Sequence, residues 1–365
     1  MTGGANGVKG LLSEGFEGIM CDLDGVVYRG NVAVPQAVES LLSALSAGTD
    51  IVFATNNASR PPAEVAAHLH ELGLPVPVTH VVTSAQAGAY YLAQRLSPGA
   101  RVLAVGGPGV PQALQEAGLT AVPARGAAVG EPVVAVLQGY GADVAWTDLA
   151  EVAYAVQAGA LWVASNIDST IPTERGVAPG NGALVAAVRL AVGLDPVVVG
   201  KPYPPLYDLS VEVLGTTNDR VLAIGDRIDT DIQGAAAAGI ASLFVFGGAH
   251  RWVDVVAAAP AARPRYLATD LRALHSPYLE PDQEPDGPSR WVCGQAHACV
   301  GPEGILVVSH AGTLNERMRA AVKALWQAGD VRGAPMDPLL GDGAKLSREL
   351  GGVPGPGHRA DLQTK

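Results

Sequence analysis

Two carboxylates near the start of the chain are the residues best suited to chemistry. Asp22 and Asp24 directly follow an apolar segment, residues 18–21, that predicts a buried strand, and Gly25 allows a turn after them. One ionised carboxylate could attack phosphorus, while the other, with a raised pKa, could protonate the leaving oxygen and later deprotonate water. The same residues are also an ordinary turn signal, so the pair alone does not establish catalysis.

An anionic nucleophile reaches a phosphate dianion only if positive charge offsets their repulsion. At 4 Å and an effective dielectric constant of 20, that repulsion is about 4 kcal/mol. Lys201, after another apolar segment, supplies an ammonium group, and Asp226 with Asp231 supplies carboxylates. Hard oxygen ligands suit Mg²⁺ better than zinc, so the sequence predicts a magnesium site. Asp229 is assigned only to the cap of the next helix.

Polar residues at the end of a second apolar segment, residues 50–54, complete the candidate site. Thr55 and Asn56 offer a hydroxyl, an amide and backbone N–H groups at the start of a helix, which together can hold phosphate oxygens. Asn57 is assigned to the same phosphate site, although a helix cap explains this residue equally well.

Apolar segments alternate with helical patterns in an order that predicts an α/β fold with a doubly wound, parallel, Rossmann-like sheet. Because the carboxyl ends of parallel strands meet at one edge of such a sheet, the polar residues after the strands should lie close together. The predicted strands of this core are 18–21, 50–54, 196–199, 221–224, 241–246 and 266–268, with helices at 37–47, after residue 62, and at 207–214.

Two further units are predicted outside this core. An inserted α/β domain has expected strands at 101–105, 133–138 and 161–165, and a small C-terminal α+β region has strands at 291–300 and 304–309 before an amphipathic helix at 314–328. The predicted organisation is 12–82 core, 83–193 inserted domain, 194–280 core, 281–289 acidic and proline-rich linker, 290–345 C-terminal region, and 346–365 disordered tail.

Composition and charge limit the possible partners. The 365-residue chain is 48% hydrophobic and 16% charged, which is typical of soluble α/β proteins with more than one domain. A net charge of −11 without a basic stripe disfavours nucleic acid. No apolar run reaches the roughly 18–20 residues of a membrane span, and the N-terminus lacks a signal peptide. Since its three cysteines are an odd and sparse set, we predict a cytoplasmic protein without disulfides.

Taken in order, the four polar motifs resemble those of the haloacid-dehalogenase (HAD) superfamily. The matching stretches are residues 22–26, 54–57, 200–202 and 225–231. The resemblance implies a phosphatase that forms an aspartyl-phosphate on Asp22 and uses Asp24 as acid and base. It also implies that Thr55, Asn56 and Lys201 bind phosphate, and that Mg²⁺ is held by Asp22, the backbone carbonyl of Asp24, and Asp226, with Asp231 acting through water.

Three stretches of the inserted domain, residues 164–168, 171–176 and 179–182, resemble the large α/β (C2-type) cap of the nucleotide, phosphoglycolate and pyridoxal-phosphate phosphatases. The likeness implies that a cap loop faces the catalytic aspartates and screens the leaving group. Ile171 stands where the pyridoxal-phosphate enzymes carry histidine, which disfavours that substrate. The predicted residues of this loop are Asn166, Asp168, Ser169, Thr170 and Ile171.

The C-terminal region resembles part of a GNAT-type acetyltransferase. It is short for the whole fold and has no evident Gly-rich acyl-CoA loop, so we predict a structural or dimer-forming appendage, with an acyl-CoA site as the alternative. Cys293, His297 and Cys299 have even spacing, which predicts one face of a packed strand rather than a metal site.

A cap of this type combined with such a tail resembles the bacterial glycerol-3-phosphate phosphatases that recycle glycerophospholipid head groups. The resemblance therefore implies a small phosphorylated metabolite, with glycerol 3-phosphate as the predicted substrate. Phosphoglycolate, pyridoxal phosphate and nucleoside monophosphates are the alternatives. A different class of function is a sensor that binds a phosphorylated metabolite without hydrolysing it and acts through the C-terminal region; the intact Asp24 argues against that alternative.

Overall fold

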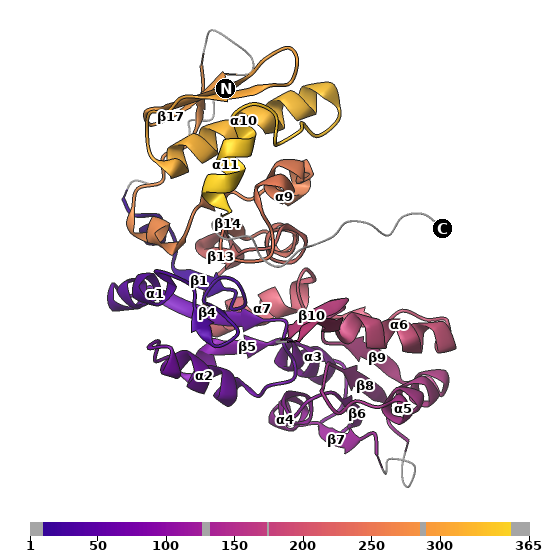
Figure 1. Cartoon of the computed structure of the whole chain (residues 1–365). Coiled ribbons are helices and arrows are strands. Elements are labelled where there is room, and N and C mark those ends of the chain that lie inside the picture. Colours follow the sequence, from indigo (N-terminus) through magenta and orange to yellow (C-terminus); the bar gives the residue numbers. More distant parts are fainter. Residues whose placement is uncertain (1–9, 126–131, 174, 285–289, 352–365) are drawn as a thin grey trace, which may run out of the picture.

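The computed structural model describes residues 10–125, 132–173, 175–284 and 290–351. Figure 1 shows a central sheet with the inserted domain on one side and the C-terminal region on another. Within the described part of the chain, no helix has the length and apolar character needed to cross a membrane.

The central sheet has six parallel strands in the order β15-β14-β13-β1-β4-β5, which confirms the predicted doubly wound core. The first strand of the sequence is an interior strand of this sheet, so the residue that follows it lies near the middle of the carboxyl edge. The strands are β1 (Gly18–Cys21), β4 (Asp50–Thr55), β5 (Val81–Thr83), β13 (Val221–Gly225), β14 (Ala241–Val245) and β15 (Tyr266–Ala268).

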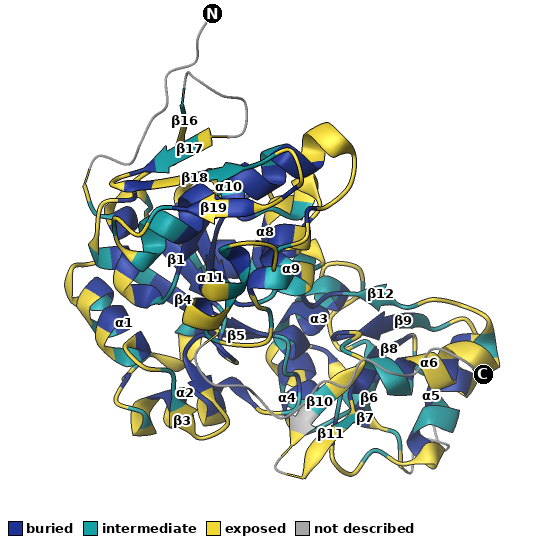
Figure 2. Cartoon of the chain, turned by 45° about the horizontal axis from the view of Figure 1, so that its top comes forward, coloured by how far each residue is buried: buried dark blue, intermediate teal, exposed yellow. Residues whose placement is uncertain are grey.

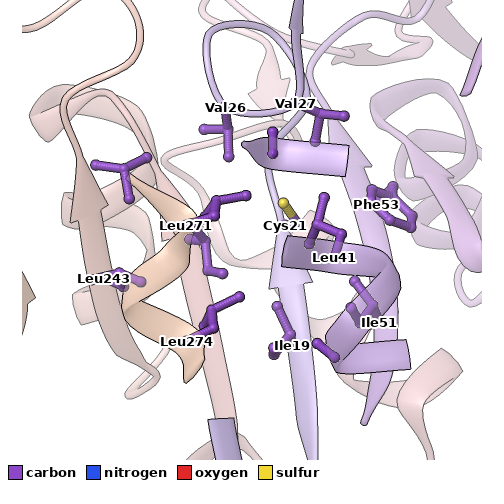
Figure 3. Packing of buried hydrophobic residues seen from close by; sticks show 14 of the residues in the cluster. Ile19, Cys21, Val26, Val27, Leu41, Ile51, Phe53, Leu243, Leu271 and Leu274 are labelled. Carbon is purple, nitrogen blue, oxygen red and sulfur yellow. The ribbon is translucent and has the colours of Figure 1, made fainter. Parts of the chain in front are cut away.

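Strand β1 is buried on both faces because its side chains alternate between two apolar clusters. Ile19 and Cys21 point into one cluster and Met20 into the other, and all three are at most 3% exposed. Figure 3 shows the first cluster, in which Ile19 and Cys21 pack with side chains of β4 and of the helices that cover this face. The covering helices are α1 (Ala37–Ser46), α2 (Pro62–Glu71) and the 3-10 helix η6 (Leu271–His275).

The opposite face of the central sheet is covered mainly by α7 (Pro204–Leu214) and α8 (Gln233–Ala237). Between β13 and α8 lies η4 (Ile228–Ile232), a short π-helical segment that carries the candidate acid Asp231 together with Asp229. The helix α9 (Trp252–Ala257) follows β14.

The inserted domain has its own parallel sheet in the order β12-β9-β8-β6-β7. Its strands are β6 (Arg101–Val105), β7 (Thr120–Pro123), β8 (Ala135–Gln138), β9 (Leu161–Ala164) and β12 (Val197–Val198). Its helices are α3 (Ser84–Ala93), α4 (Gly109–Glu116), α5 (Trp146–Gln157) and α6 (Asn181–Val192).

One strand assigned to the core belongs to this second sheet. The segment 196–199 was predicted as a core strand, but β12 pairs with β9 at Val197↔Val163 and Val198↔Ala164. The strand is only two residues long and half-buried, so its apolar sequence could not identify its neighbour. Strand β7 was not predicted because its pattern is short, partly exposed and ends in proline.

Two short hairpins add to these sheets. One joins β2 (Tyr28–Arg29) to β3 (Val32–Ala33) just after the motif that contains Asp22 and Asp24. The other joins β10 (Thr170–Thr173) to β11 (Gly176–Pro179) and continues the predicted cap loop.

The C-terminal region is an antiparallel sheet, β16-β17-β18-β19, covered by α10. The predicted strand 291–300 is in fact a hairpin, because Gly294 adopts a positive φ of 55° and reverses the chain. Cys293 therefore lies on β17, whereas His297 and Cys299 lie on β18, and the prediction of one shared strand was wrong. The elements are β16 (Asp282–Gln283), β17 (Arg290–Cys293), β18 (Ala296–Val300), β19 (Leu306–Val308), α10 (Leu314–Arg332) and α11 (Gly343–Leu350).

Two predicted boundaries of this region are also corrected. Strand β16 lies inside the expected linker 281–289, where it pairs with β17; residues 285–289 are outside the described chain. Helix α11 extends into the expected tail because Leu346 and Leu350, four residues apart, are both buried. Residues 352–365 of that predicted tail lie outside the described residues.

The C-terminal region shares an apolar core with the central domain. One cluster of buried residues combines Phe244 of β14 and Trp252 of α9 with Leu325 and Trp326 of α10. The dark blue along α10 in Figure 2 shows how much of this helix is buried. This shared apolar cluster indicates that the C-terminal region packs directly against the central domain and is not joined to it by a linker alone.

Candidate active site

Three acidic residues and one lysine meet at the carboxyl edge of the central sheet. Asp22 follows β1, Asp226 follows β13, and Asp231 lies in η4; one carboxylate oxygen from each lies within 4.8 Å of the others. The parallel register of β1 and β13, with Cys21 opposite Ile224, brings the first two together. The predicted convergence of distant motifs therefore occurs.

Lys201 links the nucleophile candidate to the third acid. Its side chain is 5% exposed, and its Nζ donates to Asp22 Oδ1, to Asp231 Oδ1 at 2.7 Å and to the backbone oxygen of Ala54 at 3.3 Å. Burial alone would lower the pKa of Lys201, but the two carboxylates raise it well above its ordinary value. The ammonium group therefore stays charged in the site.

Negative charge exceeds positive charge in this cluster. Burial raises the pKa of Asp22 well above its usual range, opposed by Lys201 and reinforced by Asp231 and Asp226. Burial, with Asp231 adding repulsion, raises the pKa of Asp226 to about 7, although a backbone hydrogen bond from Ala249 opposes the shift. Three carboxylates share one ammonium group, so the site calls for a further cation.

The donor set fits Mg²⁺. Oδ1 of Asp226 is buried without a hydrogen-bond partner in the described structure, although buried polar atoms are nearly always paired. The ligand atoms available are carboxylate oxygens, which Mg²⁺ prefers. Asp22 and Asp226 would hold the ion, with Asp231, whose Oδ2 accepts from the Arg227 backbone at 3.1 Å, beside it.

Glycines make room for the Asp226 carboxylate. A Cβ on Gly248 would lie 1.7 Å from Asp226 Oδ2, and one on Gly25 would lie 2.5 Å from the same atom. Gly25 also has a φ of 91°, which favours glycine. The turn after the aspartate motif and the loop after β14 therefore both need glycine for the acid to fit.

Asp24 lies in a different environment from Asp22. It is exposed, and its backbone forms an isolated bridge with Tyr28. Surrounding protein still desolvates the carboxyl group enough to raise its pKa, against the opposing charges of Lys201, Arg60 and His68. An accessible acid with a raised pKa is what a general acid and base requires, so the role predicted for Asp24 stays compatible with its position.

The amide of Asn56 has a use other than the predicted one. Its Oδ1 accepts from the Lys201 backbone N–H at 2.7 Å, and its Nδ2 donates to the Lys201 carbonyl at 3.1 Å and to Asp168 Oδ2 at 3.2 Å. With both ends of the amide occupied, Asn56 holds the backbone of Lys201. Phosphate binding by this side chain stays a prediction that these contacts do not favour.

Thr55 and Asn57 form a local turn beside it. The Asn57 backbone N–H donates to Thr55 Oγ1 at 3.1 Å, and Asn57 Oδ1 accepts from the Ser59 backbone N–H at 2.8 Å. Asn57 therefore closes a turn ahead of α2 rather than capping that helix, which has Pro61 at its N-cap, so the cap interpretation of Asn57 was wrong. Thr55 is buried at the end of β4, next to the carbonyl that Lys201 Nζ contacts.

Two of the five predicted cap-loop residues contact the central domain. Asn166 Nδ2 donates to the Asn56 carbonyl at 2.7 Å, and Asp168 accepts from the Asn56 amide. Within the described chain, the side chains of the other three, Ser169, Thr170 and Ile171, make no hydrogen bond to Asp22 or Asp24. The loop therefore reaches the site through its first half.

Several supporting residues escaped sequence reasoning. Asn181 Nδ2 donates to the Asn166 carbonyl at 2.7 Å, and Tyr207 donates through its hydroxyl to the Asp231 carbonyl at 3.0 Å. Tyr207 was visible only as an apolar position of a helix. Asn181 did carry a signal, because it lies in the stretch 179–182 that resembles the cap family, and Gly182 of that stretch is needed for close packing: a Cβ there would lie 2.2 Å from the Ile167 carbonyl oxygen.

Two family models match the parts of the chain that form this site. A model of haloacid dehalogenase-like hydrolases matches residues 19–120, and a second, HAD-hydrolase-like model matches residues 198–274. The first contains both aspartates of the first motif, and the second contains Lys201, Asp226 and Asp231.

Known proteins from several bacteria are similar. A D-glycerol 3-phosphate phosphatase of Mycobacterium tuberculosis is 48% identical over 258 residues, which cover 70% of this chain and 70% of that protein. A 5'-nucleotidase of Bacillus subtilis is 34% identical over 233 residues, 64% of this chain and 88% of that one.

Solved structures show the same fold. A glycerol phosphate phosphatase from Mycobacterium tuberculosis in complex with magnesium has a TM-score of 0.77 and 41% identity, over 87% of this chain and 92% of that chain. A p-nitrophenyl phosphatase from Archaeoglobus fulgidus has a TM-score of 0.65 and 25% identity, over 71% of this chain and 98% of that chain.

The close approach of Gly25 and Gly248 to the Asp226 carboxylate, here called the glycine cradle, predicts a variant with weaker Mg²⁺ binding. In Gly248→Ala, the added methyl group would displace the Asp226 carboxylate from its present position, so the Mg²⁺ concentration that half-saturates binding should rise at least ~10-fold, about 1.4 kcal/mol. Isothermal titration with Mg²⁺ measures this. Gly301→Ala is the matched control, because its Cβ would meet only one atom, at 3.8 Å. Equal Mg²⁺ affinity in the two variants would contradict the cradle.

The raised pKa values predict a pH-dependent stability in the absence of metal. Asp22, Asp24 and Asp226 hold protons in the folded chain at pH values where the unfolded chain has lost them, so stability falls as pH rises through the folded-state pKa, about 7 for Asp226. In EDTA, the thermal midpoint should decrease between about pH 5 and about pH 8, and Mg²⁺ should restore it.

The same experiment with Asp226→Asn isolates one group. Asparagine does not titrate, so the decrease in EDTA should be smaller and the restoring effect of Mg²⁺ should largely disappear. A wild-type midpoint that stays constant or increases over this pH range would show that the carboxyl groups are not destabilised by burial.

Proposed function

Because the chain belongs to the haloacid-dehalogenase superfamily of phosphatases, we propose that Asp22 carries its magnesium-dependent phosphomonoester hydrolysis and that its substrate is glycerol 3-phosphate. Hydrolysis of a phosphomonoester with Mg²⁺ is the activity of the chain; the residue roles and the substrate are the proposed part. The observation that supports them most strongly is the cluster of three carboxylates around Lys201, with Asp226 Oδ1 unpaired.

In the first step, the carboxylate of Asp22 attacks phosphorus and the bond to the leaving oxygen breaks. Asp24 gives its proton to that oxygen, so the alcohol leaves neutral and the phosphoryl group stays on Asp22. Lys201 Nζ, which donates to Asp22, offsets the negative charge of the incoming phosphate. When bound, Mg²⁺ supplies further positive charge that reduces the repulsion between the two anions.

In the second step, Asp24 takes a proton from water and the resulting oxygen attacks phosphorus. The bond to Asp22 breaks, phosphate leaves, and Asp22 is again a carboxylate while Asp24 is again protonated. The accessible position of Asp24 lets the alcohol leave and water enter between the steps. Asp22, which is largely covered, is protected from solvent during the attack.

The proposed substrate is supported by relatives. The Mycobacterium tuberculosis relative at 48% identity is a D-glycerol 3-phosphate phosphatase. The Bacillus subtilis relative at 34% is a 5'-nucleotidase, which makes a nucleoside monophosphate the first alternative, ahead of phosphoglycolate and pyridoxal phosphate. A sensor without hydrolysis has less support, because an acid with a raised pKa stands beside the nucleophile.

The remaining assignments are proposals as well. We assign the C-terminal region a structural part, since α10 buries one face against the core; the partial likeness to acetyltransferases and a homodimer stay predictions. A cytoplasmic location is proposed because Cys21, Cys293 and Cys299 are all free thiols.

Removing either catalytic carboxylate should separate their roles. Asp22→Asn should abolish Mg²⁺-dependent phosphate release, because the amide cannot form the aspartyl-phosphate. Asp24→Asn should lower kcat by ~10²–10⁴-fold, the usual contribution of general acid–base catalysis. Asp219→Asn, an exposed acid bonded to Thr217, is the control and should retain wild-type turnover. Retained activity in Asp22→Asn would reject the mechanism.

A phosphate-release panel tests the substrate. Glycerol 3-phosphate should give the highest kcat/KM among glycerol 3-phosphate, phosphoglycolate, pyridoxal phosphate and nucleoside monophosphates. A nucleoside monophosphate in first place would instead favour the alternative seen in the Bacillus subtilis relative. No release from any member of the panel would favour the sensor.

A further inference from the structure

A hollow separate from the carboxylate cluster lies between the central domain and the C-terminal region. Its volume is about 770 Å³, within the range of roughly 300–1,000 Å³ typical of small-molecule sites. Its walls come from α8, β14 and the loop before β15 on one side, and from β17 and α10 on the other. None of its lining residues belongs to the catalytic site.

Positive charge gathers in this hollow although the chain as a whole carries −11. Arg263, Arg265 and Lys323 line it, together with one acid, Asp330. Arg263 forms a two-pronged ion pair with Asp330, with both distances 2.6 Å, and Arg265 pairs with Glu280 at 2.7 Å.

Lys323 is the cation left over. Within the described residues it has neither a hydrogen bond nor an ion pair; its ammonium lies 5.8 Å from the centroid of the Trp326 ring. Its partial burial is the main cause of a lowered pKa, and the neighbouring arginines add to the effect while Glu280 opposes it. An ammonium group that is partly desolvated and crowded by two guanidinium groups gains more from an arriving anion than a free surface lysine would.

Two indole rings give the hollow a flat apolar surface. Trp326 is nearly buried, and the Arg263 guanidinium lies 5.0 Å from its centroid, so this ring supports the cations. Trp291 is only half-buried, and its Nε1 donates to Gln327 Oε1 at 2.8 Å, which fixes the orientation of the ring. A fixed aromatic side chain beside an unpaired ammonium group is suited to a ligand that is both planar and anionic.

We propose that this hollow binds a small organic anion in which a phosphate group is joined to a flat ring, the chemistry of a nucleoside diphosphate. Lys323, assisted by the flanking guanidinium groups of Arg263 and Arg265, contacts the phosphate, and Trp291 stacks on the ring. The hollow is distinct from the phosphatase centre. Its ligand therefore binds between the central domain and the C-terminal region and is not the substrate that is hydrolysed.

Calorimetric titration of the full-length protein with ADP, in buffer without Mg²⁺, tests the proposal. ADP should bind the wild type, and Lys323→Gln and Trp291→Ala should each weaken binding at least ~10-fold, since a hydrogen bond to a charged group and a base stacked on an aromatic ring each contribute this much or more. Arg348→Gln, which removes one exposed positive charge from α11, is the matched control and should bind like the wild type.

Two conservative variants distinguish the loss of a ligand contact from misfolding of the protein. Lys323→Arg keeps the positive charge and Trp291→Phe keeps an aromatic ring, so both should retain most of the affinity, and all variants should retain wild-type phosphatase activity. Pyrophosphate should bind at least ~10-fold more weakly than ADP, because it lacks the ring. Absence of ADP binding to the wild type, or wild-type affinity for ADP in both Lys323→Gln and Trp291→Ala, would overturn the proposal. Pyrophosphate binding as tight as that of ADP would overturn its aromatic part.

Discussion

The charge balance around Lys201 is the constraint on which the rest of the structure depends. Burying one ammonium group between Asp22 and Asp231 removes three charges from water, which is favourable only when their geometry compensates for the lost hydration. Here the ammonium group of Lys201 does not balance the negative charge, because Asp226 adds a third carboxylate. A divalent cation between these carboxylates would relieve their mutual repulsion, so its binding free energy also stabilises the folded chain.

The asparagine network explains how the insert and the core form one site. Asn56 holds the backbone of Lys201 on one side and Asp168 of the cap loop on the other. Asn166 returns to the Asn56 carbonyl, and Asn181 fixes Asn166 in turn. Amides suit these positions because each supplies a donor and an acceptor without adding charge to a centre that is already negative. The cap loop is thereby positioned through the same residue that positions the lysine.

The sequence predicted the core well because its signals were local. Strands such as β1 and β13 are continuous apolar runs that end in acids, and a parallel sheet buried on both faces produces that pattern. Partner choice is not local, so β12 was assigned to the wrong sheet. The hairpin at Gly294 was missed because a single glycine between apolar residues also fits a continuous strand. Asn56 was recognised as a site residue, but its contacts depend on Lys201, 145 positions away.

The seam between α10 and the core shows why a binding hollow and a structural interface can share one region. Met318, Leu325 and Trp326 of α10 are buried in the same cluster as Phe244 and Trp252, so the helix cannot leave without exposing apolar area from both regions. At the margin of that cluster, cations lie over the Trp326 ring. Acids pair with Arg263 and with the nearby Arg265 and leave the ammonium group of Lys323 unmatched, in a protein whose net charge is −11. An interface required only for packing gains nothing from that unmatched charge, whereas a ligand site does.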